Sequence, residues 1–200
     1  MGRIYYLMGK SATGKDHIYE KLLTDRRLTG LRIKPLVIYT TRPMRAGEED
    51  GVTYHFTDEA VLRSLETQGK LIEKRCYETV QGPWYYFTAD DGRIDPKTEH
   101  YLAIGTPAAY EKIRRYYGPE YVTALYVETE DGLRLERALK RERKQAVPQY
   151  EEMCRRFLAD QKDFAPEKLK SAGIGRVFTN NLDMEQCVDE IVAYMLGKYQ

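Results

Sequence analysis

The stretch Leu7-Met8-Gly9-Lys10-Ser11-Ala12-Thr13-Gly14-Lys15-Asp16 stands near the start of this 200-residue chain and decides its fold. Its two glycines and its second lysine match the pattern G-x-x-x-x-G-K. The apolar run 4–8 before it predicts a buried strand, and Ile18, Leu22 and Leu23 after it predict a helix. A strand, a glycine-rich loop and a helix in this order are the setting of a phosphate-binding loop.

The residues of this loop suit an anion for a physical reason. Glycines let the backbone turn so that successive N–H groups point at one anion, and the positive end of the following helix adds to the attraction. Lys15 would then reach the β- and γ-phosphates of a nucleotide. The alternative is a glycine-rich turn with a chance lysine, which the strand context disfavours. Asp16 departs from the motif, because a serine or threonine that ligates magnesium usually follows the lysine.

The bulk composition fits one compact domain. The chain is 42% hydrophobic and 32% charged, with a net charge of +1, which argues against a general nucleic-acid binder. No apolar run approaches the roughly 20 residues that cross a bilayer. A strand expected so near the first residue leaves no room for a signal peptide, and three cysteines at no metal-ligand spacing fit a reducing compartment. We therefore expect a cytoplasmic protein.

Strands and helices alternate along the chain. After the phosphate loop, the patterns predict strands at 35–39, near Tyr54, and at 71–80, 84–89, 101–104, 121–127 and 176–179. They predict helices at 58–68, 107–117, 131–143, 150–163 and 184–199, and a polar loop with a possible short helix at 90–99. The alternation predicts an α/β fold, with a P-loop parallel-sheet core and an inserted β-rich lobe at about 42–89.

Two charged helices in the last third of the chain carry several arginines. Arg137 and Arg141 lie four residues apart and share a helix face, whereas Arg156 lies off the apolar stripe of the second helix. That stripe consists of Tyr150, Met153, Cys154, Phe157 and Leu158. The two helices could form a lid over phosphates, or they could be a solvated charged pair, which the spacing alone favours.

A second stretch is far more specific than a phosphate loop: Thr40-Thr41-Arg42-x-x-Arg45-x-Gly47-Glu48-x-x-Gly51-x-x-Tyr54-x-Phe56. Ile72-Glu73, the arginine-rich helices and Val177-Phe178-Thr179-Asn180-Asn181 follow in order. In these motifs the chain resembles the guanylate kinases from end to end. The resemblance implies one domain over 1–200, with its core at 1–39, 90–130 and 165–200, a nucleoside-monophosphate lobe at 40–89 and a lid at 131–164. It implies transfer of the ATP γ-phosphoryl group to GMP or dGMP, with Mg²⁺, giving GDP or dGDP.

The resemblance also assigns roles to residues. It implies that the acceptor phosphate is held by Arg42, Arg45, Tyr54 and Tyr86 (or Tyr85), with Glu48 orienting Arg45 or a water, and that guanine meets Glu73 and Thr88. Arginine forks suit phosphate oxygens, and a carboxylate accepts from guanine but is repelled by adenine N1. ATP would contact Gly9, Ser11, Ala12, Thr13, Gly14, Lys15, Asp16 and Asn180. The catalytic set would be Lys15, Arg137, Arg141 and Arg156, which neutralise the transferring phosphoryl group.

Some positions depart from the family pattern. The segment Tyr101-Leu102-Ala103-Ile104-Gly105-Thr106 has no carboxylate where the family has acids that help hold magnesium or guanine. Ile38 stands in place of a serine that meets guanine, and Phe87 in place of a glycine. We expect Asp16 to supply the charge beside the metal that Ala103 and Gly105 lack. The alternative is that Asp16 only caps its helix.

Two other functions stay open. A non-catalytic guanylate-kinase-like module would use Arg42, Arg45 and Tyr54 to hold a phosphorylated peptide, although it would not need Lys15. Ile38 and Gly105 leave open a kinase for another nucleoside monophosphate. The expected partners are small-molecule nucleotides, with neither nucleic acid nor membrane, and the sequence fixes neither the acceptor base, nor the donor preference, nor the oligomeric state.

Overall fold

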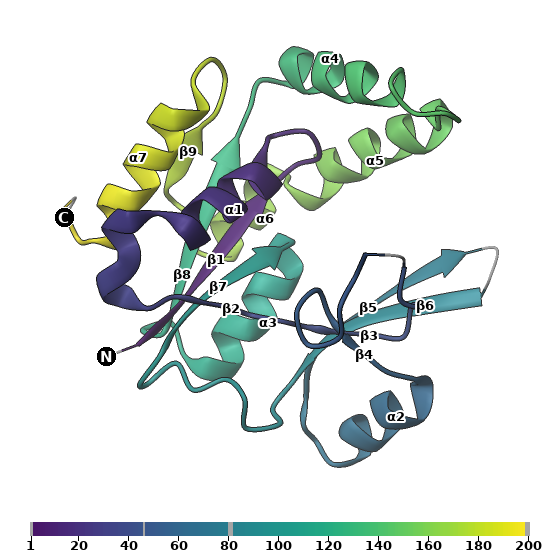
Figure 1. Ribbon diagram of the computed structural model, residues 1–200, viewed down its shortest axis with the longest axis vertical. Helices are drawn as coiled ribbons and strands as arrows, with labels where there is room; N and C mark the ends of the chain where they lie inside the picture. Colours follow the sequence, from purple (N-terminus) through teal and green to yellow (C-terminus); the bar gives the residue numbers. More distant parts are fainter. Residues whose placement is uncertain (1, 46, 80–81, 199–200) are drawn as a thin grey trace.

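The computed structural model describes residues 2–45, 47–79 and 82–198. Its main sheet has five strands in the order β2-β7-β1-β8-β9, and all of their pairings are parallel. The strands are β2 (Lys34–Pro35), β7 (His100–Gly105), β1 (Arg3–Gly9), β8 (Val122–Glu128) and β9 (Val177–Thr179). The central strand β1 therefore carries the phosphate loop at its carboxyl end (Figure 1).

Helices cover both faces of this sheet, so successive side chains of β1 enter two different cores. Tyr5 and Leu7 pack with α1 (Lys15–Thr24) and α7 (Met184–Met195), while Ile4, Tyr6 and Met8 pack with α3 (Pro107–Tyr117). The short elements η1 (Arg26–Leu31) and α6 (Pro166–Ser171) complete the two layers. Burial on both faces is the reason that β1 is a continuous apolar run rather than an alternating one.

A second sheet has four strands in the order β4-β3-β6-β5 and lies beside the core (Figure 1). Helix α2 (Glu59–Thr67) packs against it, and Leu62, Phe87 and Ala89 are buried between them. Phe87 is thus a core residue of this small sheet. The strands are β3 (Tyr39–Thr40), β4 (His55–Phe56), β5 (Leu71–Thr79) and β6 (Gly82–Ala89).

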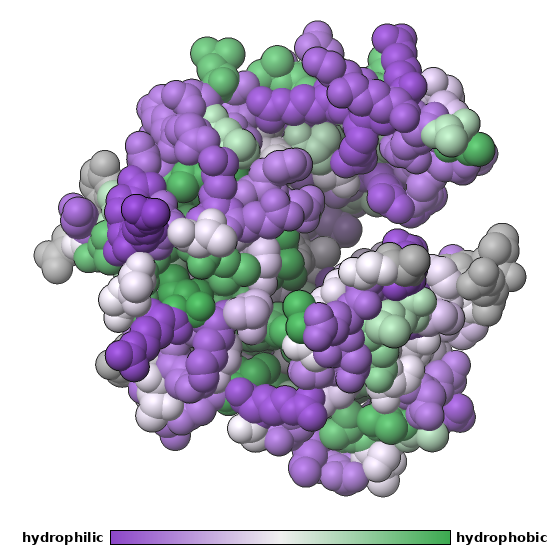
Figure 2. All heavy atoms as spheres, in the orientation of Figure 1, coloured by the Kyte–Doolittle hydropathy of each residue, from purple (hydrophilic) through white to green (hydrophobic). Residues whose placement is uncertain are grey.

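The arginine-rich segment forms the helix pair α4 (Asp131–Glu142) and α5 (Tyr150–Asp163), at the top right of Figure 1. The expected apolar stripe of α5 is not a buried one, because α5 has no fully buried residue and Tyr150, Cys154 and Leu158 are exposed. Figure 2 shows the surface hollowed between this helix pair and the small sheet.

The α/β fold and the parallel P-loop core are confirmed, and most element boundaries agree within two residues. The expected strand 35–39 is wrong, because its ends lie in two sheets as β2 and β3. Helix α7 ends at Met195 rather than at 199, and Gly197, with a φ of 70°, turns the chain there. No helix lies within 90–99, whereas η1 and α6 were not predicted. The predicted positions Val80, Gln81 and Tyr199 lie outside the described residues.

Two simpler expectations concern the whole chain. Across the part of the chain that the structure describes, no helix is long and apolar enough to span a bilayer. The three cysteines are free thiols, and Cys187 is buried in the core beside α1.

Candidate active site

The phosphate loop joins β1 to α1 through backbone that only small residues allow. A Cβ atom on Gly9 would lie 2.8 Å from the carbonyl oxygen of Val127, and one on Gly14 would lie 2.7 Å from Nδ2 of Asn180. Gly14 has a φ of 86° and Ala12 a φ of 63°. A left-handed conformation is free for glycine but costs alanine about 1–2 kcal/mol. The fold therefore requires both glycines of the motif, and it holds Ala12 in a strained conformation.

Lys15 and Asp16 open helix α1 at the carboxyl end of the core sheet. The Nζ atom of Lys15 lies 3.7 Å from Oδ2 of Asp16, whose side chain is 74% exposed. The N-cap position of α1 is Gly14, so the alternative in which Asp16 is itself the cap does not hold. Asp16 instead lies in the first turn, where a negative charge is favoured by the helix dipole.

The carboxyl end of the middle strand β7 explains one departure from the family pattern. A Cβ atom on Gly105 would overlap the hydroxyl of Tyr6, so the neighbouring strand fills the space that an acidic side chain would need. Burial raises the pKa of Tyr6 above its ordinary value, and the hydroxyl stays neutral. Ile38 packs as a partly buried residue against the same core. These positions are therefore parts of the core rather than donors to a ligand.

Asn180 and Arg137 meet at the loop after β9. Nδ2 of Asn180 donates to the carbonyl oxygen of Thr13 at 2.7 Å, which ties this loop to the phosphate loop. Arg137 donates from Nη1 to the carbonyl oxygen of Asn180 at 3.1 Å and from Nη2 to that of Asn181 at 2.9 Å. Both side chains thus hold main-chain atoms beside the phosphate loop.

A buried arginine ties the helix pair to the phosphate loop. The Arg134 side chain is fully buried, and it donates from Nε to the carbonyl oxygen of Ser11 at 3.0 Å and from Nη2 to Asp160 at 3.1 Å. The N–H of Ser11 donates to the same Asp160 oxygen at 2.7 Å. The Asp131 carboxylate pairs with Arg134, and Nζ of Lys10 lies 3.6 Å from Oδ1 of Asp131. Sequence reasoning missed these roles, because helix spacing does not show which residues meet a loop 123 and 149 positions away.

The other two arginines of the predicted catalytic set stand apart from the phosphate loop. Arg141 is 56% exposed and lies 3.9 Å from Glu142, and Arg156 is 59% exposed and donates to Glu152 at 2.6 Å. Arg155 binds the same carboxylate, and the two arginines lower the pKa of Glu152 to about 2. Arg137 is thus bonded to the loop after β9, whereas Arg141 and Arg156 pair with carboxylates of their own helices.

On the small sheet, the phosphate-binding candidates form one cluster around Arg42. Its guanidinium is 3% exposed and makes two hydrogen bonds to the Glu48 carboxylate, at 3.0 and 2.6 Å. Nη1 also donates to the carbonyl oxygen of Pro43 at 2.8 Å, and Nε donates to the hydroxyl of Tyr86 at 3.2 Å. The Tyr54 ring lies 5.5 Å from the guanidinium and 5.6 Å from the Tyr86 ring. We call Arg42, Glu48, Tyr54 and Tyr86 the Arg42 cluster.

Glu48 holds the side chain of Arg42, a partner that sequence reasoning did not assign to it. The Glu48 carboxylate fixes the side chain of Arg42 and accepts the backbone N–H of Arg45 at 2.7 Å, rather than orienting the Arg45 side chain. Arg42 is also the main reason that the pKa of Glu48 is lowered. The Arg45 side chain is exposed.

The strand pairing decides which tyrosine belongs to the site. Glu73 lies opposite Thr88 and Arg75 opposite Tyr86 in the β5–β6 ladder, so these four side chains share one face. Tyr85 points to the other face. The hydroxyl of Thr88 donates to Glu73 at 3.1 Å, and Arg75 donates to the same carboxylate twice, each time at 3.2 Å. Both predicted base-binding side chains are thus adjacent, and Arg75 is a partner that sequence reasoning did not identify.

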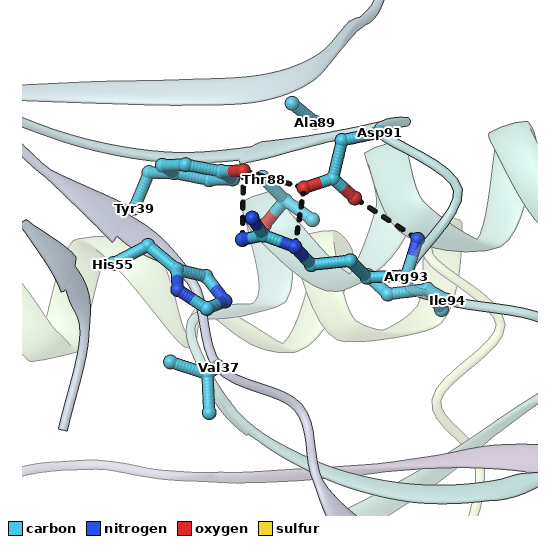
Figure 3. Close-up of a pocket in the computed structure, with 8 residues that line it drawn as sticks. All are labelled: Val37, Tyr39, His55, Thr88, Ala89, Asp91, Arg93 and Ile94. Carbon is cyan, nitrogen blue, oxygen red and sulfur yellow. Dashed lines mark hydrogen bonds and ion pairs between the residues drawn. The ribbon is translucent and has the colours of Figure 1, made fainter. Parts of the chain in front are cut away.

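Figure 3 shows a small hollow where the chain enters and leaves the small sheet. Tyr39 donates to Asp91 at 2.5 Å, and Arg93 donates to the Tyr39 hydroxyl at 3.1 Å. Desolvation and Asp91 raise the pKa of Tyr39 to about 12, and burial lowers that of His55. The hollow measures about 10 Å³, which is room for about one water molecule. It therefore serves as a junction that fixes the two crossing segments, and it is too small for a nucleotide.

The described residues offer few ligands for a metal ion. Among the described residues, no group of three or more histidines, cysteines, aspartates or glutamates is placed to hold a metal ion. Asp16 is the carboxylate beside Lys15, and the residues Ala103 to Gly105 offer none. Asp16 is therefore the carboxylate that a metal ion would meet next to Lys15.

Comparison with known proteins agrees with this geometry. The family model described as guanylate kinase matches residues 1–91. A guanylate kinase of Neisseria gonorrhoeae is 38% identical over 91 residues, which are 46% of this chain and 40% of that protein. One of Legionella pneumophila is 37% identical over 84 residues, 42% of this chain and 37% of that protein. The matched part thus spans about two fifths of the length of these curated relatives.

A solved structure extends the comparison to the whole chain. The crystal structure of guanylate kinase from Anaplasma phagocytophilum superimposes with a TM-score of 0.58 and 22% identity, covering 98% of this chain and 86% of that one. At this identity the likeness shows the fold. The first 91 residues, with the phosphate loop and the Arg42 cluster, therefore match guanylate kinases in sequence, and the chain as a whole has the fold of one.

Proposed function

We propose that this protein is a kinase that transfers the γ-phosphoryl group of ATP to GMP or dGMP. The observation that carries the proposal is the Arg42 cluster, a buried guanidinium held by a carboxylate and two tyrosines within a segment that matches guanylate kinases. Among the described residues, Arg42 makes four hydrogen bonds through four of its five N–H donors, so one donor is left for a ligand. That donor, the hydroxyls of Tyr54 and Tyr86 and the exposed Arg45 suit the oxygens of a monophosphate.

The phosphate loop would hold the donor nucleotide on the other side of the hollow. Its backbone N–H groups and Lys15 suit the β- and γ-phosphates. An oxygen of the acceptor phosphate attacks the γ-phosphorus, and the bond from that phosphorus to the β–γ bridging oxygen breaks. ADP leaves with the electron pair, and the acceptor becomes a diphosphate. Lys15 offsets the charge that develops on the leaving oxygens.

Arg141 and Arg156 would reach the transferring phosphoryl group only if the helix pair moves. Both face solvent and pair with carboxylates of their own helices. Closure over two bound nucleotides would exchange these carboxylates for phosphate oxygens and exclude water from the transfer. The helix pair would then act as the lid, and the small sheet as the lobe that holds the acceptor.

Mg²⁺ fits this site as an ion held mostly by the nucleotide. Asp16 is exposed at the start of α1, beside the lysine that would hold the phosphates. Magnesium keeps several waters and takes phosphate oxygens as ligands, so one carboxylate of the chain is sufficient. When bound, the ion supplies charge neutralisation on the phosphates. Asp16 would hold it directly or through a water.

A coupled assay of ADP formation with GMP, dGMP, AMP, CMP and UMP tests the proposal. We expect transfer to GMP and dGMP, and its loss in Lys15→Met, which should still bind GMP because the Arg42 cluster is unchanged. Turnover of another monophosphate in place of GMP would reassign the acceptor. Folded protein that binds GMP or a phosphorylated peptide but transfers nothing to any acceptor would overturn the kinase and favour the non-catalytic binding module.

A further inference from the structure

The carboxylate of Glu73 is closed off by its own neighbours. Its side chain is 1% exposed. Oε1 accepts from Thr88 and from Nη2 of Arg75, and Oε2 accepts from Nε of Arg75. Because a carboxylate oxygen offers about two lone pairs, Oε1 is filled and Oε2 keeps about one position. Guanine presents two donors on its N1 and its exocyclic amine, and both cannot bind Glu73 while Arg75 stays in place.

Arg75 is the more exposed member of this pair. Its side chain is 22% exposed, against 1% for Glu73. It lies opposite Tyr86 in the ladder, and its charge opposes the rise that burial causes in the pKa of Tyr54. The guanidinium therefore stands between the Arg42 cluster and Glu73. Among the described residues its hydrogen bonds are the two to Glu73, which leaves three N–H donors.

We propose that Arg75 selects the acceptor base by reading the O6 and N7 edge of guanine, and that Glu73 is the residue that positions it. The inference rests on the proposed kinase function. Guanine O6 and N7 are two adjacent acceptors that match a guanidinium fork, which is the commonest specific arginine contact to a base. Adenine presents an amino donor in place of O6, so the same fork disfavours it. Guanine is thus selected although Glu73 itself is covered.

The missing acid of the middle strand fits this arrangement. Tyr6 occupies the space beside Gly105, and the charges of both Arg75 and Glu73 act on its hydroxyl. An acidic side chain at position 105 would enter the same neighbourhood and compete with Glu73 for Arg75. With glycine there, Glu73 is the carboxylate that pairs with Arg75 among the described residues.

Substrate analogues test the proposal on the parent protein, by kcat/KM and by calorimetric binding. The compound 7-deaza-GMP lacks the N7 acceptor, and IMP lacks the exocyclic amine but keeps O6 and N7. Losing one charged hydrogen bond predicts a fall of about tenfold for 7-deaza-GMP. IMP should stay close to GMP. The proposal would be overturned if kcat/KM and affinity fell strongly for IMP but not for 7-deaza-GMP, because Glu73 would then be the residue that recognises guanine. Calorimetry keeps this test independent of the kinase proposal, because it needs no turnover.

Variants locate the effect on Arg75. In Arg75→Met, the ratio of GMP to 7-deaza-GMP affinity should collapse to about one, and AMP binding should hold or rise. In Glu73→Gln, KM for GMP should rise with kcat retained. The neutral glutamine binds Arg75 more weakly than the carboxylate does, so the guanidinium is no longer held in one orientation. The matched control is Lys74→Met, because Lys74 lies on the opposite face and pairs with Glu66. The proposal would be overturned if Arg75→Met left the ratio of GMP to 7-deaza-GMP affinity unchanged. It would also be overturned if the variant lost affinity equally for every monophosphate, because Arg75 would then not contact the base.

Discussion

The arginines on the two sides of the hollow are held in opposite ways. Arg42 on the small sheet is buried, and Glu48, Tyr86 and a backbone carbonyl fix it. Arg141 and Arg156 on the helix pair are more than half exposed, and each pairs with a carboxylate of its own helix. Arg42 is thus fixed by the fold itself, whereas Arg141 and Arg156 are held by exposed ion pairs.

This difference has a physical cause in burial. A buried guanidinium without partners is costly, so the fold must supply Arg42 with a complete set of acceptors. An exposed guanidinium is satisfied by water, and its local ion pair contributes only about 0–1 kcal/mol. The helix-pair arginines can therefore leave their partners at little cost. We expect Arg42 to matter for both folding and function, and Arg141 and Arg156 for function alone.

The largest expected effect is the loss of kcat when the exposed arginines of the helix pair are replaced. In Arg141→Met and Arg156→Met, kcat should fall by about 10²–10³-fold, because each removes a charge that stabilises the transferring phosphoryl group. The midpoint of thermal unfolding should not move. Steady-state kinetics and calorimetry measure both quantities. Parent kcat in both variants would break the comparison, since the helix pair would then be the solvated charged pair that its spacing allows.

Arg42→Met should have a smaller effect on rate but a real one on stability. Losing a charge-assisted hydrogen bond to the acceptor predicts a cost of about 1.5–3 kcal/mol in kcat/KM, through a higher KM and a lower kcat. Because Glu48, Tyr86 and the Pro43 carbonyl lose a buried partner, the free energy of unfolding should also fall. The control is Arg45→Met, which should lose affinity for GMP with its stability intact. A stable Arg42→Met protein would contradict the burial argument.

A smaller effect is expected for Asp16, and it tests whether this carboxylate lies beside a metal ion. Asp16→Ala should raise the Mg²⁺ concentration for half-maximal rate several-fold, because one carboxylate leaves the edge where the ion is expected. Stability should fall by no more than about 0.3–1 kcal/mol, the usual contribution of a charge at a helix N-terminus. A magnesium titration of the rate, beside thermal unfolding, separates the two. An unchanged Mg²⁺ requirement would limit Asp16 to the helix dipole.

The smallest expected effect is on hydrogen exchange. Exchange over 131–156 should slow when both nucleotides are bound, and most in the far turn 143–149, because Arg134 and Asp160 already hold the near end. Each nucleotide alone should give a weaker change. Mass spectrometry of exchanged peptides measures this, with α3 as an internal reference. Exchange that ignores both nucleotides would mean that the helix pair does not close.

The sequence predicted what local spacing encodes. The glycines and the lysine of the phosphate loop, the apolar run of β1 and the boundaries of α3 and α5 follow from nearby residues, and the structure agrees. The motif from Thr40 to Phe56 predicted a phosphate-binding segment, and Glu48 from this motif and Tyr86 do bond to Arg42. Their assignment to GMP stays a prediction, as does that of the lid.

What the sequence could not show depends on which distant segments meet. Strand 35–39 looked continuous, but its two ends pair with different sheets. Only the register of β6 against β5 and β3 shows that Tyr86, rather than Tyr85, shares a face with Glu73 and Arg75.

Asp160 meets the N–H of Ser11, Arg75 covers Glu73, and Tyr6 fills the space beside Gly105. Local patterns fix each residue's element and face, because they repeat with the period of a helix or strand. The partners of a buried charge are set by packing, because a charge removed from water must be matched by whatever the tertiary fold places beside it.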